Sequence, residues 1–235
     1  MVRQHMSGQH APTLFRLPGD TEESVLGTNP HQQVIRELIN SLEWAATRGP
    51  RWGVGGQTRI EGFRRSDGSE VPLLPDVFVY PHSWDARRGS LSIASDGPPL
   101  LTIEVTSDST WQGDLNAAAG KVYSYGEAGI QEYVVFDPTG DLLPERVRAW
   151  RREDSRFVPW LPDSDGHWHS QQLGVAFGAD GLFLRVYTGD GVPVEYDLEA
   201  RAALAELRRQ AARLTEQPRQ SNGDGVTGAG EQPGQ

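Results

Sequence analysis

The chain contains no cysteine among its 235 residues. This absence excludes a disulfide framework, a thiol nucleophile and any zinc site built from cysteine. No apolar run approaches the roughly 20 residues that are needed to cross a bilayer. The N-terminal segment MVRQHMSGQHAPTLF also lacks the continuous apolar stretch of a secretory signal peptide. These features together predict a cytoplasmic protein without a membrane segment.

Lysine is almost absent as well. Lys121 is the single lysine among 22 basic residues, and all the others are arginine. In such a chain, one retained lysine suggests a chemical role that arginine cannot fill, although a solvated helix lysine is the ordinary alternative. Acidic residues are more numerous, and the net charge of −10 works against bulk attraction to nucleic acid. A local basic surface can nevertheless coexist with a negative total.

Hydrophobic residues make up 37% of the chain and include seven tryptophans, which is sufficient for a sizeable core. The composition along the chain predicts four parts. Residues 1–28 form a flexible leader, 29–197 a folded domain, 198–217 a C-terminal helix, and 218–235 a disordered tail.

Turn and cap signals place the first elements of the domain. Asn29-Pro30 is a helix start, apolar residues recur at helical spacing over 34–42, and Gly49-Pro50 ends the helix. Strand signals follow over 52–80 and are broken by the turn-rich residues 65–69.

The middle of the chain alternates strands with a helix. Residues 100–105 are a nearly continuous apolar run, as in a strand that is covered on both faces. A helix is predicted over 116–128, closed by Gly129, and a second buried strand over 132–137. Antiparallel strands are then expected over 146–151 and 157–161 and around 178–181. This order predicts an α/β fold in which helices flank a mixed β-sheet.

Two carboxylates lie on apolar strands. Asp76 follows Pro75, and Glu104 lies between Ile103 and Val105. An ionised carboxylate is costly in such surroundings unless it is paired or bound to a cation. A solvent-facing aspartate at a strand end is the alternative for Asp76. Taken together, two carboxylates on neighbouring strands favour a site for a hard cation.

Further motifs follow these carboxylates in a fixed order. They are Pro75-Asp76-Val77, residues 102–110, Asp114, Lys121, Tyr125, Gly129, Glu132-Tyr133 and Asp137-Pro138. In this order and spacing the chain resembles the Uma2 (DUF820) family over about residues 29–216. That family belongs to the restriction-endonuclease-like, PD-(D/E)XK superfamily of nucleases. The resemblance implies a restriction-endonuclease-like mixed sheet.

The resemblance also implies roles for particular residues. Asp76 and Glu104 would hold Mg²⁺ or Mn²⁺, with the backbone carbonyl of Val105 or Thr106 as a further ligand. Lys121 would complete the catalytic set. Most PD-(D/E)XK enzymes carry the lysine two residues after the glutamate, where this chain has Thr106.

The same resemblance gives supporting roles to Asp114 and Tyr125. Lys121 follows Asp114 by seven residues rather than by the single helical turn usual in the family. An extra helical turn or a different helix start must therefore absorb the difference.

Three functions remain open from the sequence. The first is a Mg²⁺-dependent endonuclease that hydrolyses DNA, with phosphate contacts from Arg146, Arg148, Arg151 and Arg152. The second is a catalytically silent nucleic-acid-binding module that keeps the fold. The third is a self-associating interaction module, in which the apolar stripe over 200–214 forms a homodimer.

Overall fold

The computed structural model describes residues 30–49, 51–83, 85, 87–200, 202–203 and 206–207. Its contacts divide the chain into two units, Met1–Leu198 and Glu199–Gln235. The predicted leader and tail lie outside the described residues. Within the predicted C-terminal helix, residues 198–200, 202–203 and 206–207 are helical, and the others lie outside the described part. None of the described helices is both long and apolar enough to cross a membrane.

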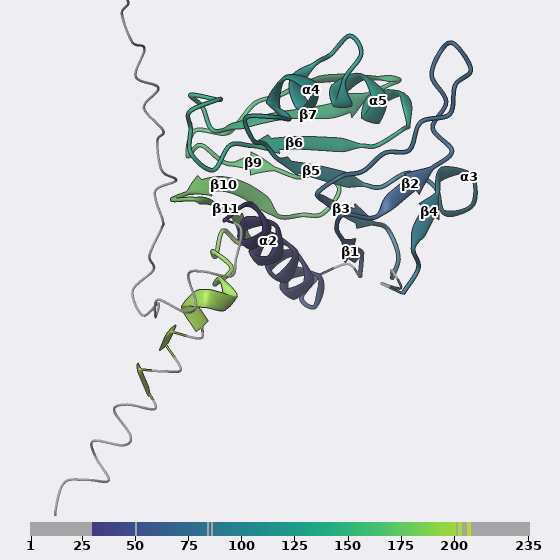
Figure 1. The fold of residues 1–235 in the computed structure, drawn as a ribbon. Coiled ribbons are helices and arrows are strands. Elements are labelled where there is room, and N and C mark those ends of the chain that lie inside the picture. The colour runs from purple at the N-terminus through teal and green to yellow at the C-terminus, as the bar shows by residue number, and fades with distance from the viewer. Residues whose placement is uncertain are drawn as a thin grey trace, which may run out of the picture. The chain divides into compact units, whose positions relative to one another are not determined.

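A six-stranded sheet forms the centre of the first unit (Figure 1). The pair β5–β6 is parallel and every other neighbouring pair is antiparallel, which confirms the predicted mixed sheet. In spatial order the strands are β1 (Gly53–Gly55), β3 (Val77–Tyr80), β5 (Leu101–Val105), β6 (Glu132–Phe136), β7 (Val147–Glu153) and β8 (Arg156–Trp160). All residues of β3, β5 and β6 are buried, because both faces of the sheet are covered.

Helix α2 (Pro30–Ala46) covers one face of this sheet (Figure 1). Its apolar stripe, which includes Leu38 and Leu42, shares a buried cluster with Ile103 of β5 and Phe177. Phe177 belongs to a second sheet, in which β10 (Ala176–Asp180) pairs with both β9 (Trp168–His169) and β11 (Phe183–Tyr187). The helix starts at the predicted proline.

Helices α4 (Trp111–Leu115) and α5 (Lys121–Glu127) lie on the opposite face. Val122 and Tyr125 pack there in a second apolar cluster with Tyr133 and Val135 of β6. A short parallel pair, β2 (Arg59–Glu61) with β4 (Ser90–Ser92), and helix α3 (Ile93–Asp96) complete the unit.

The helix predicted over 116–128 is shorter than expected. The side-chain oxygen of Asn116 accepts hydrogen bonds from the backbone N–H groups of Ala118 and Ala119, at 2.8 and 3.0 Å. These bonds stabilise a turn in place of the first helical turn. Helix α5 therefore starts at Lys121, and the separate helix α4 precedes it. The predicted closure is correct, since Gly129 has a φ of 89° just after the helix.

Candidate active site

Asp76 and Glu104 lie at the same end of two neighbouring strands of the central sheet. Val77 of β3 pairs with Ile103 of β5, so the next residues outward on these antiparallel strands are Asp76 and Glu104. The Oδ2 atom of Asp76 accepts a hydrogen bond from the backbone N–H of Val105 at 3.0 Å. The strand pairing therefore brings the two predicted metal ligands together.

The two carboxyl groups have different protonation behaviour. Burial raises the pKa of Glu104 to about 8; the nearby charge of Asp76 adds to this, while Lys121 and Tyr125 partly offset it. Burial would raise the pKa of Asp76, but the nearby His31 and the hydrogen bond from the backbone of Val105 outweigh it, and the pKa is lowered. Asp76 is therefore the stronger acid of the two, and Glu104 keeps its proton to a higher pH.

Lys121 lies between two buried carboxyl groups. Its Nζ atom is 2.9 Å from Oε2 of Glu104 and 2.9 Å from Oδ1 of Asp114. Burial lowers the pKa of Lys121, but the two acidic neighbours outweigh this effect and the pKa is raised. The lysine is therefore a fixed positive charge, and 31% of its side chain remains exposed.

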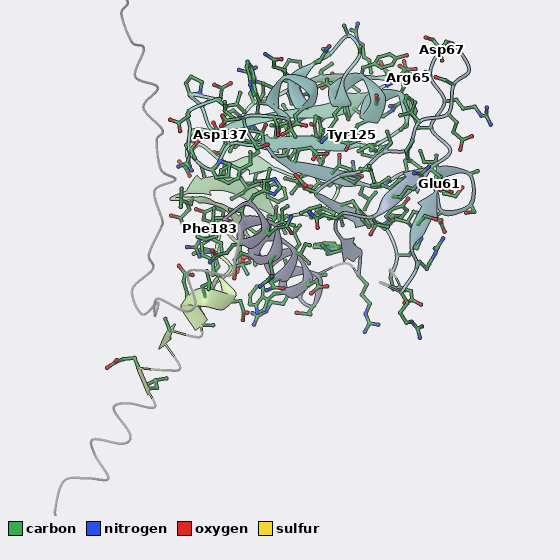
Figure 2. The ribbon with its side chains drawn as sticks, in the orientation of Figure 1. Glu61, Arg65, Asp67, Tyr125, Asp137 and Phe183 are labelled. Atoms are coloured by element: carbon green, nitrogen blue, oxygen red, sulfur yellow. The ribbon has the colours of Figure 1, made fainter. Side chains whose placement is uncertain are left out.

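Two hydroxyl groups hold these acids in place. Tyr125 donates to Oε1 of Glu104 at 2.5 Å, and Figure 2 shows this tyrosine inside the body of the domain. Thr106 donates through Oγ1 to Oδ2 of Asp114 at 2.9 Å. Thr106 thereby orients the acid that contacts Lys121.

A close contact between α4 and α5 sets the position of Lys121. A Cβ atom at Gly120 would lie 2.2 Å from the carbonyl oxygen of Gly113 and 2.6 Å from Cβ of Asn116. Only glycine fits such a contact, which lets α5 begin directly against α4. The seven-residue spacing from Asp114 is thus absorbed by a different helix start, one of the two alternatives expected.

Comparison with known proteins identifies the family. The Uma2 family model, described as "putative restriction endonuclease", matches residues 10–178. The chain belongs to the Uma2 family. Among solved structures, the chain is similar to a "putative nuclease belonging to DUF820" from Anabaena variabilis. That similarity has a TM-score of 0.41 and 17% identity, and covers 58% of this chain and 70% of the other. None of the curated proteins matches the sequence.

In this Uma2 chain, the predicted phosphate-binding arginines contact other parts of the protein. Arg146 donates to the backbone carbonyl groups of Pro138 and Gly181. Arg152 donates to the backbone carbonyl group of Gly126. The guanidinium group of Arg151 lies 5.4 Å from the centre of the Trp160 ring. Contact with phosphate stays a prediction for these three arginines.

Arg148 is placed closest to the carboxylates in the sheet register. It pairs with Val135 across β6–β7, and Val135 pairs with Glu104 across β5–β6. Residues in one such row share a face, so Arg148 and Glu104 lie on the same face two strands apart, roughly 10 Å at the usual strand spacing. Its guanidinium group pairs with the exposed Glu145.

His31 also lies at the site, and it was not predicted from the sequence. It lies in the first turn of α2, and its Nε2 atom is 2.7 Å from the backbone oxygen of Val105 and 3.6 Å from Oδ2 of Asp76. The nearby carboxylate of Asp76 raises the pKa of His31; burial opposes the shift and the hydrogen bond to Val105 adds to it. A histidine directly after a helix-starting proline was the available signal, but its partner is 74 residues away.

A surface cavity of about 400 Å³ lies elsewhere on this unit. It is lined by the end of α2 and by loop residues that include Arg48, Trp52, Gln171 and Thr188. None of the predicted site residues lines it. The charged groups that shift one another's pKa values lie in the carboxylate cluster and not at this cavity.

Proposed function

We propose that this Uma2 protein is an endonuclease that hydrolyses DNA phosphodiester bonds with Mg²⁺ or Mn²⁺. In this proposal Asp76, Glu104 and the backbone carbonyl of Val105 hold the cation, and Lys121 acts on the phosphate. Membership of a family described as putative restriction endonucleases supports a nucleic-acid substrate.

One observation carries the proposal: Asp76 and Glu104 lie opposite each other at one end of the antiparallel strand pair β3–β5. Burial is the main cause of the raised pKa of Glu104, and the charge of Asp76 adds to it, so further positive charge nearby would favour ionisation of both groups. Lys121 already supplies one positive charge. A bound divalent cation would add further positive charge and would favour ionisation of both carboxyl groups.

The donor atoms fit a hard divalent cation. Carboxylate and carbonyl oxygens are the ligands that Mg²⁺ and Mn²⁺ prefer. Over the described ranges, no three His, Asp or Glu side chains form a ready-made metal cluster. The proposed set does not need one, because one of its three donors is a backbone carbonyl. When bound, the cation supplies Lewis-acid polarisation of the phosphate group.

Lys121 is suited to stabilise the negative charge that develops on the phosphate oxygens during hydrolysis. Preorganised donors of this kind need no reorientation in the transition state. Asp114 and Glu104 hold the ammonium group from two sides, and Thr106 fixes Asp114 in turn. Arg148, on the same face of the sheet, is the arginine best placed to contact a neighbouring phosphate.

A catalytically silent nucleic-acid-binding module is the second candidate. It is favoured by one observation: both oxygens of Glu104 already have partners, Tyr125 on one and Lys121 on the other. A carboxylate so engaged can be a structural group that keeps the fold intact without turnover.

Incubation of the purified protein with varied DNA and RNA substrates separates the two candidates. We expect cleavage of DNA with Mg²⁺ or Mn²⁺, none with EDTA, and none in an Asp76→Ala variant. Binding of nucleic acid that is equal in parent and variant, without any cleavage, would support the silent module instead.

A further inference from the structure

The first turn of α2 brings an imidazole nitrogen to the proposed cation site. The Nε2 atom of His31 approaches two proposed ligand atoms, the backbone oxygen of Val105 at 2.7 Å and Oδ2 of Asp76 at 3.6 Å. Adjacent ligands around an octahedral ion with bonds of about 2.1 Å are separated by about 3 Å. Both distances from Nε2 are therefore close to the separation of neighbouring ligands around one cation.

We infer that His31 is a further ligand of the cation, coordinating through Nε2. This inference rests on the proposed function, since it uses the same Asp76 and Val105 donors. The oxygen of Val105 is an acceptor, so Nε2 must carry a hydrogen in their 2.7 Å contact. Coordination replaces that hydrogen with the cation, and the ring keeps its hydrogen on Nδ1: the imidazolium form releases one proton to solvent, and the neutral form moves its hydrogen from Nε2 to Nδ1.

One change would make two ligands available. While Nε2 donates to Val105, the nitrogen lone pair is used by its proton and the carbonyl oxygen accepts a hydrogen bond. When the cation takes the place of that hydrogen, the Nε2 atom of His31 and the backbone oxygen of Val105 can both face the cation. Asp76 needs no reorientation, because the backbone N–H of Val105 already holds its Oδ2 atom at 3.0 Å.

A nitrogen ligand has a consequence for metal choice. Imidazole binds Mn²⁺ and Co²⁺ more readily than Mg²⁺, which is held chiefly by oxygen donors and water. The site should therefore bind Mn²⁺ more tightly than Mg²⁺, and the difference should depend on His31. A site made only of Asp76, Glu104 and a carbonyl group would lack this dependence.

The test measures binding of Mn²⁺ alone and of Mg²⁺ alone to the full chain by titration calorimetry. Pulsed electron paramagnetic resonance of the Mn²⁺ complex reports whether a nitrogen nucleus is bonded to the ion. We expect a nitrogen signal in the parent, its loss in His31→Ala, and a fall in Mn²⁺ affinity of about tenfold or more, by analogy with the effect of disturbing metal-ligand shells. The affinity for Mg²⁺ should change less.

Other outcomes would overturn the inference. An absent nitrogen signal in the parent would do so without any variant, and so would unchanged Mn²⁺ affinity in His31→Ala. Tighter Mn²⁺ binding in that variant would mean that the imidazole blocks the site. His31→Gln is a second variant that keeps a hydrogen-bond donor for Val105, should the alanine variant fold poorly.

Asp76→Asn separates this inference from the proposed function. If it abolishes Mn²⁺ binding while the parent shows no nitrogen signal, the cation site stands and only the role of His31 is wrong. If Mn²⁺ binding survives Asp76→Asn unchanged, the proposed cation site itself is wrong.

Discussion

Lys121 differs from every other basic residue in the chain because it is the single lysine and lies between Glu104 and Asp114. If it stabilises the transition state, Lys121→Arg should lose most activity although the charge is kept. A guanidinium group is planar and bulkier and cannot occupy the position of the ammonium group between two buried acids.

Lys121→Ala should cost a similar amount, on the order of 3 kcal/mol in the barrier, as for the loss of one transition-state donor. Single-turnover cleavage rates at saturating Mn²⁺ measure this, so that a change in cation affinity through Glu104, which Lys121 contacts at 2.9 Å, does not enter the comparison. A Lys121→Arg protein that cleaves as fast as the parent would rule out the proposed role.

Glu104 makes the stability of the metal-free protein depend on pH. Its pKa rises from 4.5 to about 8 on folding, so the folded state binds more protons than the unfolded state between these values. The free energy of unfolding should therefore fall as the pH rises through this window. The pKa of Lys121 is raised from 10.5, so its contribution is lost only at higher pH.

Glu104→Gln should flatten this dependence and leave the metal-free variant more stable than the parent at pH 8.5. Urea unfolding at pH 5, 7 and 8.5 in EDTA measures both effects. His31, whose raised pKa acts in the same direction, is present in both proteins, and Glu104 is the smallest cause of its shift, so the comparison reports mainly on Glu104. Equal slopes for parent and variant would show that Glu104 is ionised throughout.

At the scale of elements, the junction between α4 and α5 decides where the lysine lies. Gly120→Ala would place a Cβ atom 2.2 Å from the carbonyl oxygen of Gly113, so the helices must separate. We expect a loss of about 1–3 kcal/mol in the free energy of unfolding, the usual cost of overpacking. Activity should fall further, because Lys121 moves with α5.

Gly113→Ala is the matched control for this prediction. It lies in α4, and a Cβ atom there meets nothing within 4 Å. Alanine also favours the helix over glycine, so this variant should be as stable as the parent or more stable. Urea unfolding of both variants measures the contrast, and equal stability would contradict the packing argument.

The elements also show how far sequence reasoning reaches. The apolar runs of β5 and β6 were recognisable because strands covered on both faces need such sequences. By contrast, β2 and β4 are three residues each, and their pairing joins segments about 30 residues apart. The helix predicted to start at residue 116 starts later, at Lys121, because the Asn116 side chain competes for the backbone N–H groups of the residues after it.

The residues of the candidate site were likewise predictable only in part. Asp76 and Glu104 were recognisable as candidates, since a carboxylate among apolar strand residues is costly unless it is paired or bound to a cation. His31 was not, because its place beside Val105 depends on how α2 packs on the sheet. The four arginines were found by their clustering, yet sequence alone did not show that Arg146 and Arg152 would be engaged by backbone carbonyl groups.

At the scale of the whole molecule, a net charge of −10 must be reconciled with the proposed DNA substrate. Affinity that depends on a few local contacts should respond weakly to salt, because each neutralised phosphate contributes about one unit to the slope of log K against log salt. The exposed arginines that have acidic partners, such as Arg64 with Glu70, reduce the positive charge that is available for phosphate.

Self-association is the remaining prediction for the whole chain. The segment over 200–214 places Ala200, Leu204, Leu207, Ala211 and Leu214 at spacings of three and four, with charged residues between them. Such a stripe is typical of helices that pair with a second copy. Most of it lies outside the described residues, but Leu207, which is described, is 61% exposed.

We expect the full chain to form a dimer in solution and a chain that ends at residue 197 to be a monomer. Light scattering coupled to size exclusion measures the mass of each, and circular dichroism checks that the shortened protein keeps its fold. Substitution of Leu204 and Leu207 by glutamate in the full chain is the matched test, since it keeps the length and removes the apolar stripe. A dimer that survives both changes, or a full chain that is already monomeric, would exclude an oligomerising role for this segment.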